Sequence, residues 1–408
     1  MTRHLLRLIW NRKRTNLLIM IEIFFSFLVV FAVVAVAAYY LNNYRQPLGF
    51  SSDDVWAVGI GIPTRGGPGE DDKAAAQAMR ETMRQLHLAV GEFSEVAASA
   101  GAFTVPYGGS RWTSGAEVDG RKYDYSLDAV TDGFAQVMGL QIVDGRWFGR
   151  EDDGAAWTPV VVNQRLAQEF FGTARAAGRN VPQEKPRASE SQKQMRIVGV
   201  VSEFRQDGEL SQPENYVFVR QRVDHPDANE HLNYLAIRVR PGTTAAFEEA
   251  LVKRMQATAK DWSFEVRPLA DMRAEQLKET LTPLVAEAVV GGFLMLMVAM
   301  GLTGVLWQTV TQRTREIGLR RAKGATIPNI RMQILGELVV MTTAAVLLGT
   351  VVVVQFPLLR MFGWVSAGVY ASSLVISAAC IYLLTVACAW YPSRMATAIQ
   401  PAEALHYE

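Results

Sequence analysis

Long apolar runs alternate with one large block of mixed polar and apolar positions along this chain of 408 residues. Residues 17–41 contain a single charge, Glu22, and exceed the roughly 20 residues that cross a hydrocarbon core of about 30 Å. Three further runs of spanning length occupy residues 288–310, 334–357 and 371–391. The pattern therefore predicts one transmembrane helix, a large inserted block and three more transmembrane helices.

Within residues 42–287, short strand-like stretches alternate with helical ones. Strands are expected at residues 55–62, 160–163, 195–201, 234–240 and 263–266, and helices at 71–98, 164–171, 243–259 and from 269 toward the second span. Residues 173–194 hold two prolines and many charges, which predicts an exposed loop. The strand, helix and strand after residue 234 are typical of a split-βαβ module. The predicted fold class is a membrane protein with four transmembrane α-helices, one plus three, and a large α+β domain inserted between the first and second.

Charge is distributed unevenly between this block and the spans. Residues 42–282 carry 28 of the 41 basic and 34 of the 40 acidic residues, so the net charge of +1 hides an acidic block between basic flanks. This distribution excludes a plain cytosolic enzyme, a disordered protein and a general nucleic-acid binder, whose basic charge would lie on a soluble face.

Basic residues in the short loops predict the orientation of the spans. They form one cluster before the first span and another between the second and third: Arg3, Arg7, Arg12, Lys13 and Arg14, then Arg313, Arg315, Arg320, Arg321, Lys323 and Arg331. Because such loops stay in the cytoplasm, residues 1–16, 311–333 and 392–408 are expected there, and residues 42–287 and 358–370 on the outer face. A cleaved signal peptide is the alternative for the first run, but its apolar stretch is too long.

The loop after the second span has the composition of a docking helix. Ile317, Ala322 and Ala325 offer apolar contact among basic residues, and Gly324 followed by Pro328 ends the helix. Such a helix can enter a partner's groove, or its cations can anchor the spans on anionic headgroups. The acid in this loop, Glu316, can pair with a partner arginine or with Arg320 at i+4, and the local pair is preferred.

Glu22 and Glu337 each lie several residues inside a span that begins on the predicted cytoplasmic side. Ionisable groups at such positions are costly and indicate a functional or paired role. A proton site for a secondary transporter is one interpretation, and ion pairing with loop arginines is the other. Pairing is preferred because no second acid within either span continues a relay.

Enzyme and metal signatures are absent from the sequence. No histidine has a cysteine or zincin-type partner at ligand spacing. Asp224, His225, Asp227 and His231 can approach a metal, but a solvated loop is the preferred interpretation, and neither a catalytic nor a metal site is expected. Cys380 and Cys388 both lie in the last span and are expected to be structural.

Several segments resemble one family of membrane proteins. Residues 133–140 read GFAQVMGL and residues 144–148 read DGRWF, and together they resemble the yF-x-v-m-g … l-x-G-R-x-F signature of MacB-like periplasmic core domains. VVVNQRLAQEFFG at 160–172 and RIVGVVSEF at 196–204 resemble the next segments of that family, in the same order. REIGLRRAKGA at 315–325 is similar to a cytoplasmic loop of MacB-like and FtsX-like permeases, and residues 391–408 resemble their closing segment.

The resemblance implies a type VII ABC permease in the bacterial inner membrane, with both termini cytoplasmic and residues 42–287 as its periplasmic domain. Such a subunit acts by mechanotransmission: a cytoplasmic ATPase drives motion of the periplasmic domain. The implied partners are that ATPase, a second permease copy or paralogue, a periplasmic membrane fusion protein and an outer-membrane channel. The matching positions that are implied to couple to the ATPase are Arg315, Glu316, Ile317, Gly318, Arg320, Arg321, Gly324, Ala325, Pro401 and Leu405.

The sequence departs from MacB itself, which carries a fused ATPase. It contains no G-x-x-x-x-G-K-[ST] motif, and the glycine-rich residues 66–69 lack the lysine. The chain is therefore expected to bind no cofactor and to be non-catalytic by itself, with ATP and Mg²⁺ held by a separate ATPase. Efflux of drugs, peptides or other periplasmic substrates is the leading expectation. Lipoprotein release, control of cell-wall hydrolases and ligand sensing without transport remain alternatives, and the substrate is not specified.

Overall fold

The computed structural model describes residues 13–63, 72–118, 120–182, 193–222, 232–359 and 365–398. They belong to two compact units, a helical unit of Met1–Asn42 with Leu281–Glu408 and an inter-span domain of Asn43–Thr280. Four helices in the described part of the chain are long and apolar enough to cross a membrane. The predicted fold class, four spans with an α+β domain between the first and second, is confirmed.

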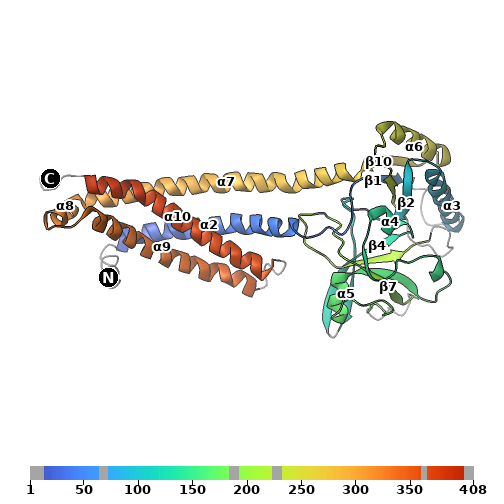
Figure 1. Ribbon diagram of the computed structural model, residues 1–408, viewed down its shortest axis with the longest axis horizontal. Helices are drawn as coiled ribbons and strands as arrows, with labels where there is room; N and C mark the ends of the chain where they lie inside the picture. The colour runs from blue at the N-terminus through green and yellow to red at the C-terminus, as the bar shows by residue number, and fades with distance from the viewer. Residues whose placement is uncertain are drawn as a thin grey trace. The chain divides into compact units, whose positions relative to one another are not determined.

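Long apolar helices make up the helical unit (Figure 1). They are α2 (Lys13–Tyr44), the C-terminal part of α7 (Leu269–Gln312), α9 (Ile327–Leu358) and α10 (Ala367–Ala398), with the short α8 (Thr314–Ala322) between α7 and α9. α9 and α10 pack against each other, and their core includes Phe27 of α2 and Leu302 of α7. Gly349 of α9 lets the Phe27 ring approach closely, since a Cβ there would lie 2.9 Å from Phe27 Cε1.

The inter-span domain contains a ten-stranded sheet in the order β10-β1-β9-β2-β4-β8-β6-β7-β5, with β3 paired to β4. One end of this sheet consists of β1 (Val55–Gly61), β2 (Val96–Ala102), β9 (Tyr234–Val239) and β10 (Ser263–Pro268). α3 (Asp72–Gly91) connects β1 to β2, and α6 (Ala245–Thr258) connects β9 to β10. Because β1 lies between β9 and β10, and antiparallel to both, the predicted split-βαβ module is present.

Two such modules interleave at this end of the sheet. β9 lies between β1 and β2, just as β1 lies between β9 and β10. α3 and α6 pack together and cover one face, with Leu86, Leu251 and Met255 buried against β1 and β9 (Figure 1). The apolar faces of the two helices thus account for one of the cores of the domain.

The chain between β2 and β9 supplies the rest of the sheet. It contributes β3 (Trp112–Val118), β4 (Arg121–Val130), α4 (Phe134–Met138), β5 (Ile142–Gly145), the 3₁₀ turn η1 (Arg150–Asp152), β6 (Thr158–Asn163), α5 (Gln164–Phe171), β7 (Met195–Val201) and β8 (Tyr216–Arg220). β2 joins β4 through the single pair Ala102 and Val130. The insertion therefore extends the sheet through a narrow junction.

Two sequence predictions for this domain were wrong in part. The helix expected at 71–98 ends at Gly91, and Val96 already belongs to β2; the alanine-rich strand carries little β-branched signal. The loop expected to be exposed at 173–194 buries Ala176 and Val181, because its backbone pairs with β7 through Arg179 and Ile197. Residues 183–192 lie outside the described residues.

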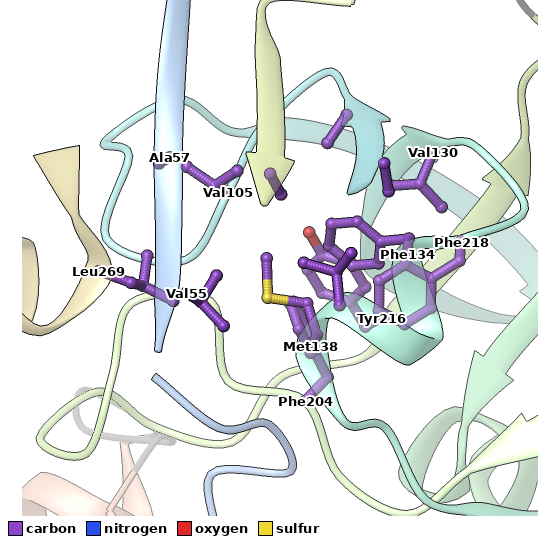
Figure 2. Packing of buried hydrophobic residues seen from close by; sticks show 14 of the residues in the cluster. Val55, Ala57, Val105, Val130, Phe134, Met138, Phe204, Tyr216, Phe218 and Leu269 are labelled. Atoms are coloured by element: carbon purple, nitrogen blue, oxygen red, sulfur yellow. The ribbon is translucent and has the colours of Figure 1, made fainter. Parts of the chain in front are cut away.

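A second core lies on the other face of the sheet and brings distant segments together. Phe134 and Met138 of α4 pack with Phe204, Tyr216 and Phe218 (Figure 2). Val55, which starts β1, and Leu269, which starts α7, belong to the same cluster. The first turn of α7 is therefore part of the domain core.

Candidate coupling site around α8

The loop predicted to dock a partner forms α8, which packs against the helices on either side of it. The chain turns at Arg313, between α7 and α8. Gly324, which follows α8, has a positive φ of 94°, a conformation in which glycine commonly ends a helix. Ile317 is 8% exposed and packs with Val310 of α7 and Ile330 of α9. Its side chain therefore faces inward, and its contact with a partner stays a prediction.

A chain of polar side chains fastens α8 to its neighbours. Arg320 donates from Nη2 to Glu316 Oε1 and from Nη1 to Gln333 Oε1, each at 2.6 Å. Gln333 Nε2 donates in turn to Glu337 Oε1 at 3.2 Å, and Arg313 Nη1 donates to Glu337 Oε2 at 2.5 Å. The chain links α8 to α9 and to the end of α7, so displacement of α8 would disturb both long helices.

The exposed apolar surface of this loop includes Ala322, which the sequence analysis named, and also Leu319, which it did not. Leu319 is 49% exposed, and Ala322, Lys323 and Gly324 are exposed beside it. The sequence did contain this signal, because residues two apart on a helix cannot share a face, so an inward Ile317 directs Leu319 outward. Leu319 is the exposed apolar side chain that sequence reasoning missed.

The other predicted coupling residues are only partly described. Glu316 forms the local pair with Arg320, which was the preferred interpretation. Arg315, Gly318 and Arg321 lie on α8, but their side-chain surroundings are outside the described part of the structure. Ala325 is half-buried against the Ile317 cluster. Pro401 and Leu405 lie outside the described residues.

The two intramembrane acids have different surroundings. Glu337 has its ion pair with Arg313, as the preferred interpretation expected. Glu22 lies against Gly301 of α7, where a Cβ would run into its carboxylate. Among the residues that the structure describes, no ion pair is formed by Glu22. Within the described residues, the preferred pairing interpretation is therefore realised for Glu337, and for Glu22 it stays a prediction.

The segments that suggested a family have structural roles in the inter-span domain. Gly145 has a φ of 66°, and a Cβ there would lie 2.8 Å from Ala177. Arg146 pairs with the buried Asp152 at 2.8 and 2.5 Å, and Phe148 is buried. The hydrogen bond from Arg146 holds the pKa of the Asp152 carboxyl below its usual range, against the opposing effect of burial. These residues shape the fold of the inter-span domain.

The segment at residues 160–172 determines where α5 begins and ends. Asn163 caps it, because its side chain accepts a hydrogen bond from the Leu166 amide, and Gly172 ends it in the left-handed conformation. The helix has the bounds that the sequence predicted.

No group of three or more His, Cys, Asp or Glu side chains that could hold a metal occurs in the described ranges. Asp224, His225, Asp227 and His231 lie outside those ranges. Cys380 and Cys388 are free thiols.

Comparison with known proteins gives two domain matches. Residues 17–254 match the MacB-like periplasmic core domain, and residues 288–401 match the FtsX-like permease C-terminal domain. The first match covers the first span and most of the inter-span domain, and the second covers the remaining spans, in the order that the sequence segments suggested.

Similar proteins include transporters from several bacteria. The macrolide export ATP-binding/permease protein MacB of Bdellovibrio bacteriovorus is 27% identical over 71% of this chain and 45% of its own length. The ABC transporter permease YknZ of Bacillus subtilis is 25% identical over 70% of each chain. The chain thus spans less than half of the MacB relative. The periplasmic region of MacB from Actinobacillus actinomycetemcomitans matches 59% of this chain at 12% identity, with a TM-score of 0.37.

Proposed function

Because this chain belongs to the MacB-like, FtsX-like family of ABC transporter permeases, we propose that it couples ATP hydrolysis by a separate cytoplasmic ATPase to motion of its periplasmic domain. The transporter permease role follows from the family. The proposal adds the direction of coupling, with α8 on the cytoplasmic side receiving motion and the inter-span domain using it.

The observation that carries this proposal is the continuity of α7. It starts in the core of the inter-span domain, where Leu269 and Met272 are buried, and continues as one helix to Gln312, with Pro283 inside it. Arg313 and the Glu337 pair then connect its end to α8. A helical connection can transmit a displacement along its axis, whereas a flexible linker would absorb it.

The cargo and the partner proteins are part of the proposal. We expect ATP and Mg²⁺ to bind the ATPase, and the permease to act as a dimer in the inner membrane with its termini in the cytoplasm. A membrane fusion protein and an outer-membrane channel would complete an export path for drugs, peptides or other periplasmic substrates. Lipoprotein release and control of cell-wall hydrolases would use the same mechanical step.

Stiffness of α7 can be tested with matched substitutions at residues 286–288, which are exposed. Replacing Ala286, Glu287 and Ala288 by three glycines softens the helix, at about 1 kcal/mol for each glycine. Replacing Glu287 by alanine gives three alanines and keeps the helix stiff. We expect the glycine variant to bind its ATPase and hydrolyse ATP normally but to export at least about tenfold less, and the alanine variant to behave as the parent.

Equal export by the two variants would contradict transmission through α7. A chain that neither co-purifies with an ATPase nor stimulates one would contradict the permease proposal as a whole and favour a ligand sensor.

A further inference from the structure

One loop of the inter-span domain, residues 203–211 between β7 and β8, contacts the end of α2 and the chain that follows it. We call this loop the hub segment. Its Arg205 is fully buried. Arg205 Nη1 donates to the carbonyl oxygens of Asn43 and Gln46, at 2.8 and 3.2 Å. Nη2 donates to the carbonyl oxygens of Glu209, at 2.6 Å, and Ser211. One guanidinium therefore ties the hub segment to the end of α2.

Residues 43–49, which we call the strap, also pair directly with the hub segment. Asn43 Nδ2 donates to the Leu210 carbonyl oxygen, and the Arg205 amide donates to the Leu48 carbonyl oxygen, each at 3.1 Å. Gly49 has a φ of 84° and lies so close to the Glu203 backbone that no Cβ fits. The strap is thus held along its length by backbone and side-chain contacts.

The same hub segment holds the beginning of α7. Arg273, in the second turn of α7, forms an ion pair with Glu209, whose side chain is nearly buried. This hydrogen bond is the main cause of the raised pKa of Arg273. The other Glu209 oxygen accepts a hydrogen bond from Tyr107 Oη at 3.4 Å. Phe204 of the hub segment and Leu269 of α7 share one core cluster (Figure 2).

The hub segment is itself fixed to the domain. Gln206 Nε2 donates to the Ser110 carbonyl oxygen at 2.5 Å and to Thr104 Oγ1 at 3.2 Å, and its Oε1 accepts from Tyr216 Oη at 2.9 Å. A Cβ on Gly208 would lie 2.5 Å from the Tyr107 ring, so the loop fits closely over this tyrosine. The hub segment is therefore anchored on the domain side as well.

We infer that the hub segment is a clasp, with Arg205 and Glu209 as positioning residues, that holds the end of α2 and the start of α7 in one register and passes their displacement to the inter-span domain. Arg205 fixes the α2 side through carbonyl groups, and Glu209 fixes the α7 side through Arg273. Because both residues belong to one short loop, loosening one connection loosens the other. The use of this clasp during an ATP cycle rests on the proposed function, whereas the mechanical link between the two connections does not.

The link can be measured on the full-length chain in lipid nanodiscs by amide hydrogen exchange. The probe amides are Gln46 in the strap, which donates to the Asn43 carbonyl oxygen, and Arg205 in the hub segment. Arg273→Gln removes the charge that pairs with Glu209. We expect exchange at both probe amides to rise about tenfold, the factor that corresponds to 1.4 kcal/mol of local opening. Exchange in strand β9 should not change.

Arg267→Gln is the matched control, because Arg267 pairs with Glu275, which also lies on α7 but outside the clasp. It should leave both probe amides as in the parent. Arg273→Lys keeps the positive charge and should restore most of the protection, even if Arg273→Gln also accelerates exchange in β9. Faster exchange confined to the first turns of α7 in Arg273→Gln would mean that the two connections are independent, and would overturn the clasp.

A second readout separates the clasp from the proposed function. In vesicles that contain the chain and an ATPase which co-purifies with it, Arg273→Gln should retain ATP hydrolysis and lose about tenfold in export, and Arg267→Gln should retain both. Unchanged export in Arg273→Gln, with the exchange increase present, would overturn the role in coupling. If the parent chain has no ATPase partner, the proposed function fails, and the hydrogen-exchange result still decides whether the clasp exists.

Discussion

Arg313 Nη1 lies 2.5 Å from Glu337 Oε2, so the turn after α7 is paired with a carboxylate inside α9. Both side chains are nearly buried, at 12% and 8% exposed. The net stabilisation from a buried ion pair is small, because both charges lose their hydration. Removing one partner is costly, because it leaves the other charge buried without a counter-charge. Glu337 therefore has a structural partner, and Gln333 extends the contact to Arg320 on α8.

Glu337→Gln should destabilise the helical unit. It leaves Arg313 without its counter-charge, and loss of a hydrogen bond between charged groups costs about 1–3 kcal/mol. The expected result is a fall of several degrees in the thermal unfolding midpoint of the detergent-solubilised chain. Glu316→Gln removes a more exposed i,i+4 pair and should cost less than about 0.5 kcal/mol. Equal shifts for the two variants would contradict the structural role of Glu337.

Ile317 and Leu319 should respond differently to truncation. Ile317→Ala leaves a cavity between α7, α8 and α9 and should cost about 2–4 kcal/mol of stability. Leu319→Ala removes a half-exposed side chain, so stability should change little, while the affinity for the ATPase should fall about tenfold if Leu319 is an interface anchor. Thermal unfolding and a binding titration measure the two effects. Unaltered binding by Leu319→Ala would move the docking surface away from this face of α8.

Glycine-to-alanine substitutions at three positions in the spans compare sites that differ in the space around the added methyl group, and the most open site serves as the control. A Cβ at Gly349 would press on the buried Phe27 ring, and a Cβ at Gly301 on the flexible carboxylate of Glu22, whereas Gly304 has open space. Gly349→Ala should therefore cost about 1–3 kcal/mol, and Gly301→Ala less, because Glu22 can move aside. Gly304→Ala should be neutral or slightly stabilising. Thermal unfolding of the three variants gives the order, and a destabilising Gly304→Ala would contradict it.

The sequence predicted the elements whose pattern is strong and local. α5 has a capping asparagine and a terminal glycine, and β7 is apolar apart from Arg196, so both were found near their bounds. β2 was missed because its alanines and glycine have no strand preference; it is a strand because β9 pairs with it. β3, β4, β5 and β8 were not predicted; β4, β5 and β8 pair with strands that are distant along the chain, whereas β3 pairs with β4 in a hairpin.

The candidate site was predicted in its location but not in its detail. The basic loop gave the position of α8, and the spacing of Glu316 and Arg320 gave their pair. The inward side chain of Ile317 depends on Val310 and Ile330, which lie on two other helices. The clasp was not predicted at all, because Arg205 and Glu209 lie far along the chain from their partners Asn43 and Arg273, and no motif marks them.

Asp152 should make the free energy of unfolding of the inter-span domain depend on pH in the acidic range. The hydrogen bond from Arg146 lowers the pKa of Asp152 in the folded chain relative to its ordinary value, which is about 3.9. At a pH between the folded-state pKa and the ordinary pKa of Asp152, the unfolded chain therefore binds more protons than the folded chain. The stabilisation is fully present above about pH 5 and is lost as the pH falls through the folded-state pKa.

Asp152→Asn should remove this contribution, about 1–2 kcal/mol at pH 7 because Arg146 is half-exposed. Thermal unfolding of the full chain, followed by tryptophan fluorescence between pH 3 and 7, should show parallel curves for parent and variant above about pH 5 that converge below it. Glu151→Gln, which removes a more exposed partner of the same arginine, should give a small offset at pH 7. A gap between parent and Asp152→Asn that stays constant down to pH 3 would mean that packing rather than the carboxylate charge makes the contribution.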